Sequence, residues 1–192
     1  MAGRRPDPLD DPMADALVRG AAPSADAPHA RELMLFGQFV GAWDVEVPYH
    51  GPDGRTEVRH GEWLFGWVLE GQGVQDVWRV PSRAEAARTG APLFGYGTTV
   101  RFYDPRLGAW RSTWHGLVKG EVIPFIGREV DGEIHLEHRE DGGQVRRWAF
   151  SDITPQSFRW RNERSADGGR TWRLEQAMLA KRRSDPPHRC LV

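Results

Sequence analysis

The sequence predicts an all-β protein, a roughly ten-stranded antiparallel up-and-down β-barrel with a short N-terminal helix capping one end. Three observations support this prediction. From Trp43 onward, short runs of alternating apolar and polar residues follow one another, as in half-buried strands. Turn sequences rich in Gly, Asp and Pro separate these runs. No helix of useful length interrupts them, which excludes parallel βαβ units. Closure removes the exposed edges of such a meander, and a two-sheet sandwich is the alternative.

The helix is expected just before the first strand. Leu33, Phe36 and Val40 recur at helical spacing, which predicts an apolar stripe on one face. Gly37 and Gly41 limit the length of this helix to one or two turns.

Ten strands are predicted in sequence order after this helix, most of them joined by tight turns. They are residues 42–50, 57–71, 74–80, 94–104, 109–116, 121–130, 133–140, 144–151, 157–165 and 171–182. The longest connection is residues 81–92, which are polar and leave room for one helical turn.

The chain is expected to form one barrel domain between two tails. Residues 1–29 are rich in Pro, Ala and Asp without a sustained period, so we predict a disordered N-terminal tail. The barrel domain is predicted to span residues 30–183. Residues 184–192 are predicted to be a disordered C-terminal tail.

Composition argues against several classes of partner. The chain of 192 residues has a formal net charge of -1, which disfavours a broad basic surface that would bind nucleic acid or an anionic membrane. No apolar run is long enough to span a bilayer, and the N-terminal arginines lack an apolar stretch behind them, so no signal peptide is expected. The only cysteine is Cys190, which excludes an internal disulfide and predicts a cytoplasmic location.

The strands suggest a cavity that holds a small hydrophobic or aromatic molecule. The chain has 9 tryptophans, and most strands pair an apolar row of side chains with a mixed polar row. Ligand-holding barrels have linings of this partly aromatic, partly polar kind. The sequence leaves open which row points inward. The predicted ligand-binding residues are Trp63, Phe65, Trp67, Trp78, Tyr96, Arg101, Tyr103, Trp114 and His115.

An enzyme that uses the same cavity is the alternative function, for example a cyclase or isomerase of small-molecule, natural-product metabolism. His115, Glu62 and Asp76 are the candidate acid–base groups, because imidazole and carboxylate side chains transfer protons. The two carboxylates and His60, with Arg101 and Tyr103, are expected to form either an interior polar cluster or outward cross-strand pairs. His115 is equally consistent with an exposed strand histidine. A third alternative is self-association of barrels, as in a homodimer.

Other motifs add no catalytic machinery. His135 and His138 have opposite parities on a predicted strand, so no metal site is expected. The sequence has no nucleophile elbow, phosphate loop or dinucleotide fingerprint. Residues 165–172, SADGGRTW, match the Asp-box hairpin, in which Asp167 accepts backbone N–H groups and Trp172 packs beneath the turn. We interpret this turn as a folding device.

The order of these segments resembles the calycin superfamily, which includes lipocalins, fatty-acid-binding proteins and nitrobindins. A short helix precedes Gly-x-Trp at residues 41–43, and the meander ends in an arginine-bearing strand. Three segments carry the likeness: RFYDPRLGAWRSTW, FSDITPQSFRWRNERSADGGRTW and EQAMLAKR. Within the superfamily, residues 31–182 are most similar to small bacterial lipocalin-like domains.

The resemblance implies roles for the first strand and for the last one. Trp43 would close one end of the barrel, and Arg173, Arg182 or Arg183 would stack on its ring as a cation–π pair. Nitrobindins bind haem through a histidine late in the barrel, whereas beyond residue 138 this chain has only His188. We therefore expect no cofactor, with haem as the less favoured alternative.

Overall fold

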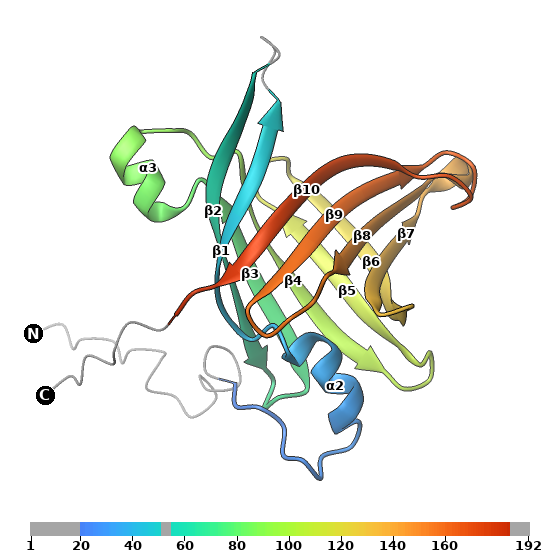
Figure 1. The fold of residues 1–192 in the computed structure, drawn as a ribbon. Coiled ribbons are helices and arrows are strands. Elements are labelled where there is room, and N and C mark those ends of the chain that lie inside the picture. Colours follow the sequence, from blue (N-terminus) through green and yellow to red (C-terminus); the bar gives the residue numbers. More distant parts are fainter. Residues whose placement is uncertain (1–19, 51–54, 185–192) are drawn as a thin grey trace, which may run out of the picture.

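The computed structural model describes residues 20–50 and 55–184, and it confirms the predicted fold class (Figure 1). Ten antiparallel strands form a closed barrel in which sequence neighbours pair and the first strand pairs with the last. The strands are β1 (Gly41–His50), β2 (Thr56–Val68), β3 (Gly73–Val80), β4 (Gly95–Asp104), β5 (Ala109–Gly116), β6 (Glu121–Val130), β7 (Glu133–Arg139), β8 (Val145–Ser151), β9 (Ser157–Ser165) and β10 (Arg173–Arg182). Each strand predicted from the sequence is therefore present.

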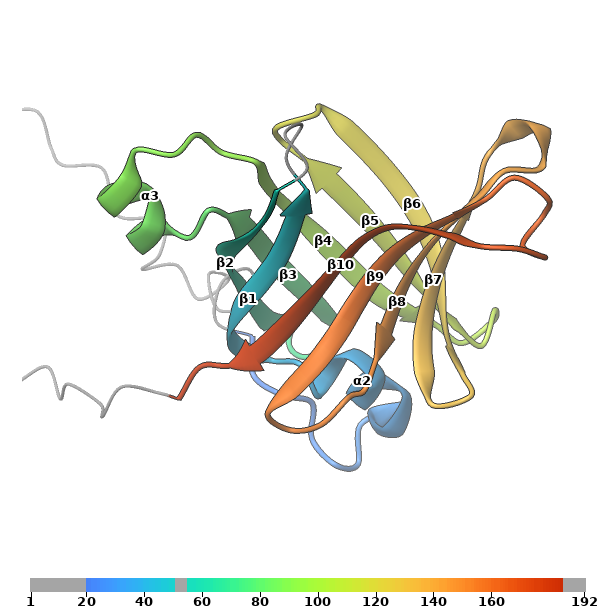
Figure 2. The ribbon, with the colours of Figure 1, turned by 45° about the horizontal axis from the view of Figure 1, so that its top comes forward.

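One end of the barrel is covered by α2 (Ala30–Gly37), the helix that the apolar spacing predicts (Figure 2). Its Phe36 is fully buried and meets Trp110 of β5 edge-on, with ring centroids 4.9 Å apart. Phe39, just after the helix, meets Phe158 of β9 at 4.8 Å. Edge-to-face packing of this kind is favourable for aromatic rings. We call this end, with α2 over it, the plugged end.

Trp43 lies in the packed core at the plugged end. Only 1% of its surface is exposed, and its indole Nε1 donates a hydrogen bond of 2.7 Å to the carbonyl oxygen of Phe39. The guanidinium carbon of Arg182 lies 4.1 Å from the centre of its ring. Arg182 also donates to the carbonyl oxygens of Val40 and Pro155, so it joins β10 to the segments on both sides.

Arg182 is the one of the three candidate arginines that stacks on Trp43. Arg183 instead pairs with the carboxylate of Asp44 on the outer surface. Arg173 begins β10, whereas Arg182 ends it, so the strand itself separates Arg173 from Trp43. The cation–π pair that the resemblance implies is thus present, and Arg182 is the partner of Trp43.

The structure answers which row of side chains points inward. On β2, Trp63 and Phe65 are buried inside, whereas Leu64 is 55% exposed on the outer face. The long connection after β3 contains α3 (Arg83–Thr89), which lies outside the barrel beside β2 (Figure 1).

The Asp-box turn between β9 and β10 has the expected geometry. Asp167 accepts hydrogen bonds from the backbone N–H groups of Arg170 and Thr171, and from the hydroxyl of Ser165. The hydroxyl of Thr171 donates to its second carboxylate oxygen at 2.6 Å. These bonds, that of Thr171 foremost, hold the pKa of Asp167 far below its ordinary value.

The predicted tails fall largely outside the described residues, namely at residues 1–19 and 185–192. Residues 20–29 lead into α2, where the ring of His29 lies 5.2 Å from that of Tyr103 and Gly20 pairs with Trp67. The tail boundaries stay predictions. Within the described part of the chain, no helix is long and apolar enough to cross a membrane.

Candidate functional site

Five tryptophans from five strands form a closed belt around the inside of the barrel. Neighbouring ring centroids are 6.3 Å apart for Trp78 and Trp114, 5.6 Å for Trp114 and Trp148, 5.3 Å for Trp148 and Trp160, and 6.5 Å for Trp160 and Trp63. Trp63 and Trp78 close the belt because they face each other in the β2–β3 register. All four measured pairs are edge-to-face, the favourable geometry for aromatic rings. We call this set the tryptophan belt.

Where the structure describes the chain, the tryptophan belt meets the plugged end only at Trp63, whose ring centroid lies 5.6 Å from that of Phe158. On β5, Trp110 contacts α2 and Trp114 belongs to the belt, with both side chains on the inner face. Four residues of strand separate them, which is about 13 Å along the barrel. The interior therefore has an aromatic plug at one end and an aromatic belt toward the other.

Two glycines on β4 make room for the belt. A Cβ atom on Gly95 would lie 2.2 Å from the ring of Trp78, and one on Gly97 would lie 2.4 Å from the ring of Trp114. Both indoles thus lie directly against the β4 backbone, where any larger residue would displace them. The sequence Gly-Tyr-Gly is what permits this close approach.

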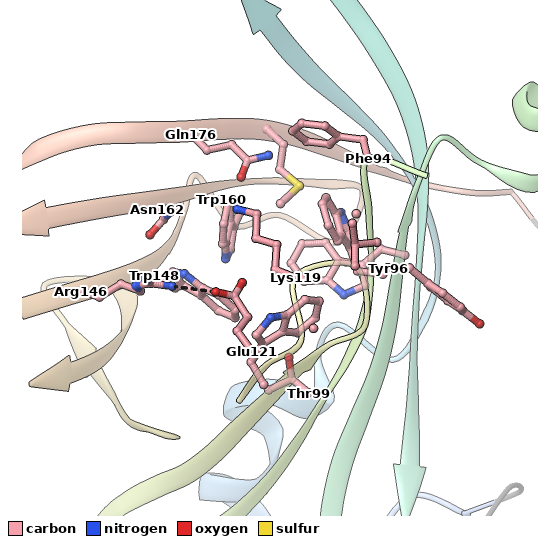
Figure 3. Close-up of a pocket in the computed structure, with 17 residues that line it drawn as sticks. Phe94, Tyr96, Thr99, Lys119, Glu121, Arg146, Trp148, Trp160, Asn162 and Gln176 are labelled. Atoms are coloured by element: carbon pink, nitrogen blue, oxygen red, sulfur yellow. Dashed lines mark ion pairs between the residues drawn. The ribbon is translucent and has the colours of Figure 1, made fainter. Parts of the chain in front are cut away.

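The belt surrounds a cavity of about 110 Å³ (Figure 3). Besides the belt, its lining has three kinds of side chain. They are apolar Phe94, Val118 and Met178, neutral polar Thr99, Asn162 and Gln176, and charged Lys119, Glu121 and Arg146. Arg146 lies between two carboxylates, 3.8 Å from Glu121 and 3.7 Å from Glu140.

A buried ion pair lies outside this lining, in the barrel interior toward α2. Arg101 and Asp76 are both inaccessible to solvent, and Arg101 Nη1 lies 2.6 Å from Asp76 Oδ2. The guanidinium carbon is 4.9 Å from the ring of Phe36 in α2 and 5.6 Å from the ring of Phe65. Each charge neutralises the other, so the pair joins β3 to β4 within an apolar core.

The predicted ligand-binding residues separate into three groups. Four of the nine line the cavity: Trp63, Trp78, Tyr96 and Trp114. Tyr96 only borders the cavity, because Figure 3 shows its ring directed away from it.

Four others lie in the barrel interior toward the plugged end, namely Phe65, Trp67, Arg101 and Tyr103. The ring of Trp67 lies so close to α2 that a Cβ on Gly37 would come within 2.3 Å of it. The ring of Tyr103 packs 6.2 Å from that of Trp110. His115 is exposed on the outer face, in a groove that it shares with Val77 and Val122.

The three candidate acid–base groups do not meet in the cavity. His115 faces outward, and Glu62 makes a 2.8 Å ion pair with Arg83 on the outer face. Asp76 faces inward but is bound to Arg101. Among the residues that the structure describes, no group of three His, Cys, Asp or Glu side chains is placed to hold a metal ion.

The cavity also contains residues that the sequence reasoning did not select. Trp148 and Trp160 belong to the belt, and each lies two residues from a buried phenylalanine on its own strand, Phe150 and Phe158. Residues two apart on a strand face the same side, so each phenylalanine indicated that its neighbouring tryptophan points into the barrel. Arg146 has the same parity as Trp148 and Phe150 on β8, and its neighbour Arg147 faces the outer surface, where it pairs with Glu163.

Comparison with known proteins shows the fold and nothing finer. The chain matches no protein-family model and no curated protein sequence. It is similar to the S-type phycobiliprotein lyase CPES from Guillardia theta, with a TM-score of 0.50 and 13% sequence identity over 80% of this chain and 93% of that one. It is also similar to Rv2717c from M. tuberculosis, with a TM-score of 0.52 and 14% identity over 82% of this chain and 99% of that one. The protein is thus a closed ten-stranded antiparallel barrel, and its fold is similar to that of both proteins.

Proposed function

We propose that this protein binds a small aromatic or hydrophobic molecule in the cavity of the tryptophan belt. The observation that carries the proposal is the closed belt around a cavity, formed by five tryptophans from five strands. Ligand sites are characteristically concave and aromatic, with a few convergent polar groups. Asn162, Gln176 and Arg146 supply such groups here.

The contrast between the two ends of the barrel supports a binding role. At the plugged end, the rings of Phe36, Phe39 and Phe158 pack against one another and fill the interior. At the tryptophan belt, by contrast, the aromatic rings surround a cavity. The cavity of about 110 Å³ is on the order of the space that one aromatic ring occupies, since an apolar cavity of roughly 150 Å³ binds benzene. A larger ligand would place one ring within the belt and its remainder toward the mouth.

The positions of His115, Glu62 and Asp76 favour binding over acid–base catalysis by these three groups. Catalysis requires the acid and the base within reach of one substrate. His115 and Glu62 lie outside the barrel, and Asp76 is held by Arg101 away from the cavity lining. We further propose that the chain belongs with small bacterial lipocalin-like domains. From CPES, named as a phycobiliprotein lyase, we carry over only the barrel fold.

The proposal is tested with phenylnaphthylamine, an uncharged dye whose fluorescence rises in apolar sites. We expect saturable binding to the native protein. Asn162→Phe places a ring in the cavity and should weaken binding by about tenfold or more, which is about 1.4 kcal/mol. His115→Phe introduces the same ring on the outer face and is the matched control. Binding that is absent from the native protein, or equally weakened by both variants, would refute the proposal.

A further inference from the structure

The tryptophan belt presents hydrogen-bond donors that have no acceptor. In the described part of the chain, four of its indoles have a buried Nε1 without a partner: Trp63, Trp78, Trp148 and Trp160. The Nε of Arg146 in the same lining has no hydrogen bond either. An indole N–H and a guanidinium N–H donate only, so no change of tautomer or rotation of an amide can convert them into acceptors.

At the plugged end, the Nε1 of Trp43 donates to the carbonyl oxygen of Phe39 at 2.7 Å. The buried Nε1 of Trp110 at that end also lacks a partner among the described residues, but Trp110 packs against Phe36 and does not line the cavity. A buried donor without an acceptor costs free energy, and buried tryptophans usually find a partner for this reason. The four unpartnered N–H groups of the tryptophan belt belong to indoles that line one cavity, so they indicate what the ligand should bring to it. An aliphatic chain brings no acceptor and leaves every one of these groups unsatisfied.

The charge of the lining points in the same direction. Lys119 and Arg146 carry two positive charges into it, and Glu121 carries one negative charge. Figure 3 shows the side chain of Lys119 extending over the space that the tryptophans surround, with Glu121 directed toward Arg146. Of the three, Lys119 is the one without an ion pair to the described residues, so it is available to an anionic group at the mouth.

We infer that the ligand is an oxygen-bearing aromatic anion, such as an aromatic carboxylate or phenolate, and not an aliphatic chain or a neutral hydrocarbon. Its ring lies within the tryptophan belt, its oxygen atoms accept from the indole N–H groups, and its negative charge lies near Lys119 and Arg146. This inference rests on the proposed binding function, because it specifies the chemistry of the molecule in the same cavity.

Two dyes that share one ring system test the inference. Anilinonaphthalene sulfonate carries an anionic group with acceptor oxygens, and phenylnaphthylamine lacks it. We expect the native protein to bind the sulfonate about tenfold more tightly, since charge-assisted hydrogen bonds are the strong ones. Lys119→Gln and Arg146→Gln should each weaken sulfonate binding several-fold and weaken binding of the uncharged dye less. Arg139→Gln removes a charge from the exposed outer face and should change neither affinity.

A second pair of variants separates hydrogen bonding from charge. Trp160→Phe keeps a ring and removes one unpartnered N–H, so it should weaken the sulfonate more than the uncharged dye. Trp43→Phe is the matched control, because the Nε1 of Trp43 already donates to the carbonyl oxygen of Phe39 outside the cavity, and it should change neither affinity. Equal native affinities for the two dyes would overturn the inference and leave the binding function standing. Failure of both dyes to bind would instead overturn the binding function.

Discussion

Replacing Trp43 by alanine tests whether this residue holds the plugged end together. A tryptophan buries on the order of 200 Å² of surface. At about 25 cal/mol per Å², this is worth roughly 5 kcal/mol, an upper bound because the unfolded chain already hides part of that area. The variant also loses the hydrogen bond to Phe39 and the contact with Arg182. We expect Trp43→Ala to lower the free energy of unfolding by about 3–5 kcal/mol.

Trp172→Ala is the matched control for this prediction. The guanidinium carbon of Arg147 lies 3.8 Å from the centre of the Trp172 ring, much as Arg182 lies 4.1 Å from that of Trp43. Trp172, however, is only half-buried on the outside of the barrel. The pair of variants therefore compares burial at nearly constant cation–π geometry, and Trp172→Ala should cost about 1 kcal/mol.

Urea unfolding followed by far-ultraviolet circular dichroism measures both losses without relying on tryptophan emission. The free energy of unfolding should fall with urea concentration at a similar slope in the two variants, so their unfolding midpoints can be compared directly. If Trp43→Ala were no more destabilising than Trp172→Ala, the claim that Trp43 anchors the plugged end would be wrong.

Three further outcomes are expected. Asp76→Asn leaves Arg101 charged and unpaired in the core and should cost about 3–5 kcal/mol in urea unfolding, whereas replacing both residues by apolar ones should cost less. Gly97→Ala should cost about 1–3 kcal/mol and weaken dye binding, because the new Cβ meets both the backbone oxygen of His115 and the Trp114 ring, whereas Gly66→Ala, with nothing within 4 Å, should not weaken it. Because folding lowers the pKa of Asp167, its contribution is present above the ordinary carboxyl pKa of about 3.9 and is lost as the pH falls. The difference in urea midpoint between the native protein and Asp167→Asn should thus be larger at neutral pH than at acidic pH, and a constant difference would contradict this reasoning.

The fold could be predicted from the sequence because the signals that determine it lie within each strand and the turn that follows it. Alternation within each strand and a turn signal after it determine an antiparallel meander, and closure follows from the number of strands. The helix at the plugged end was also predictable, since Leu33 and Phe36 repeat at helical spacing. The location in the cytoplasm and self-association stay predictions.

The site was only partly predictable because its position along each strand depends on the barrel's register. Trp63 and Trp67 share one face of β2, yet Trp63 lines the cavity whereas Trp67 packs against α2. Parity separates inside from outside, but it does not say which end of the barrel a side chain occupies. His115 shows the complementary error, since its neighbour Trp114 faces the cavity and alternation then places His115 outside.

Indole N–H resonances of the tryptophans, followed by ¹⁵N-correlated nuclear magnetic resonance while anilinonaphthalene sulfonate is added, test the central claim most directly. The account predicts that the signals of Trp63, Trp78, Trp148 and Trp160 shift with saturation, whereas those of Trp43 and Trp172 stay in place. Shifts confined to Trp172, or spread evenly over all of these signals, would contradict a ligand site within the tryptophan belt.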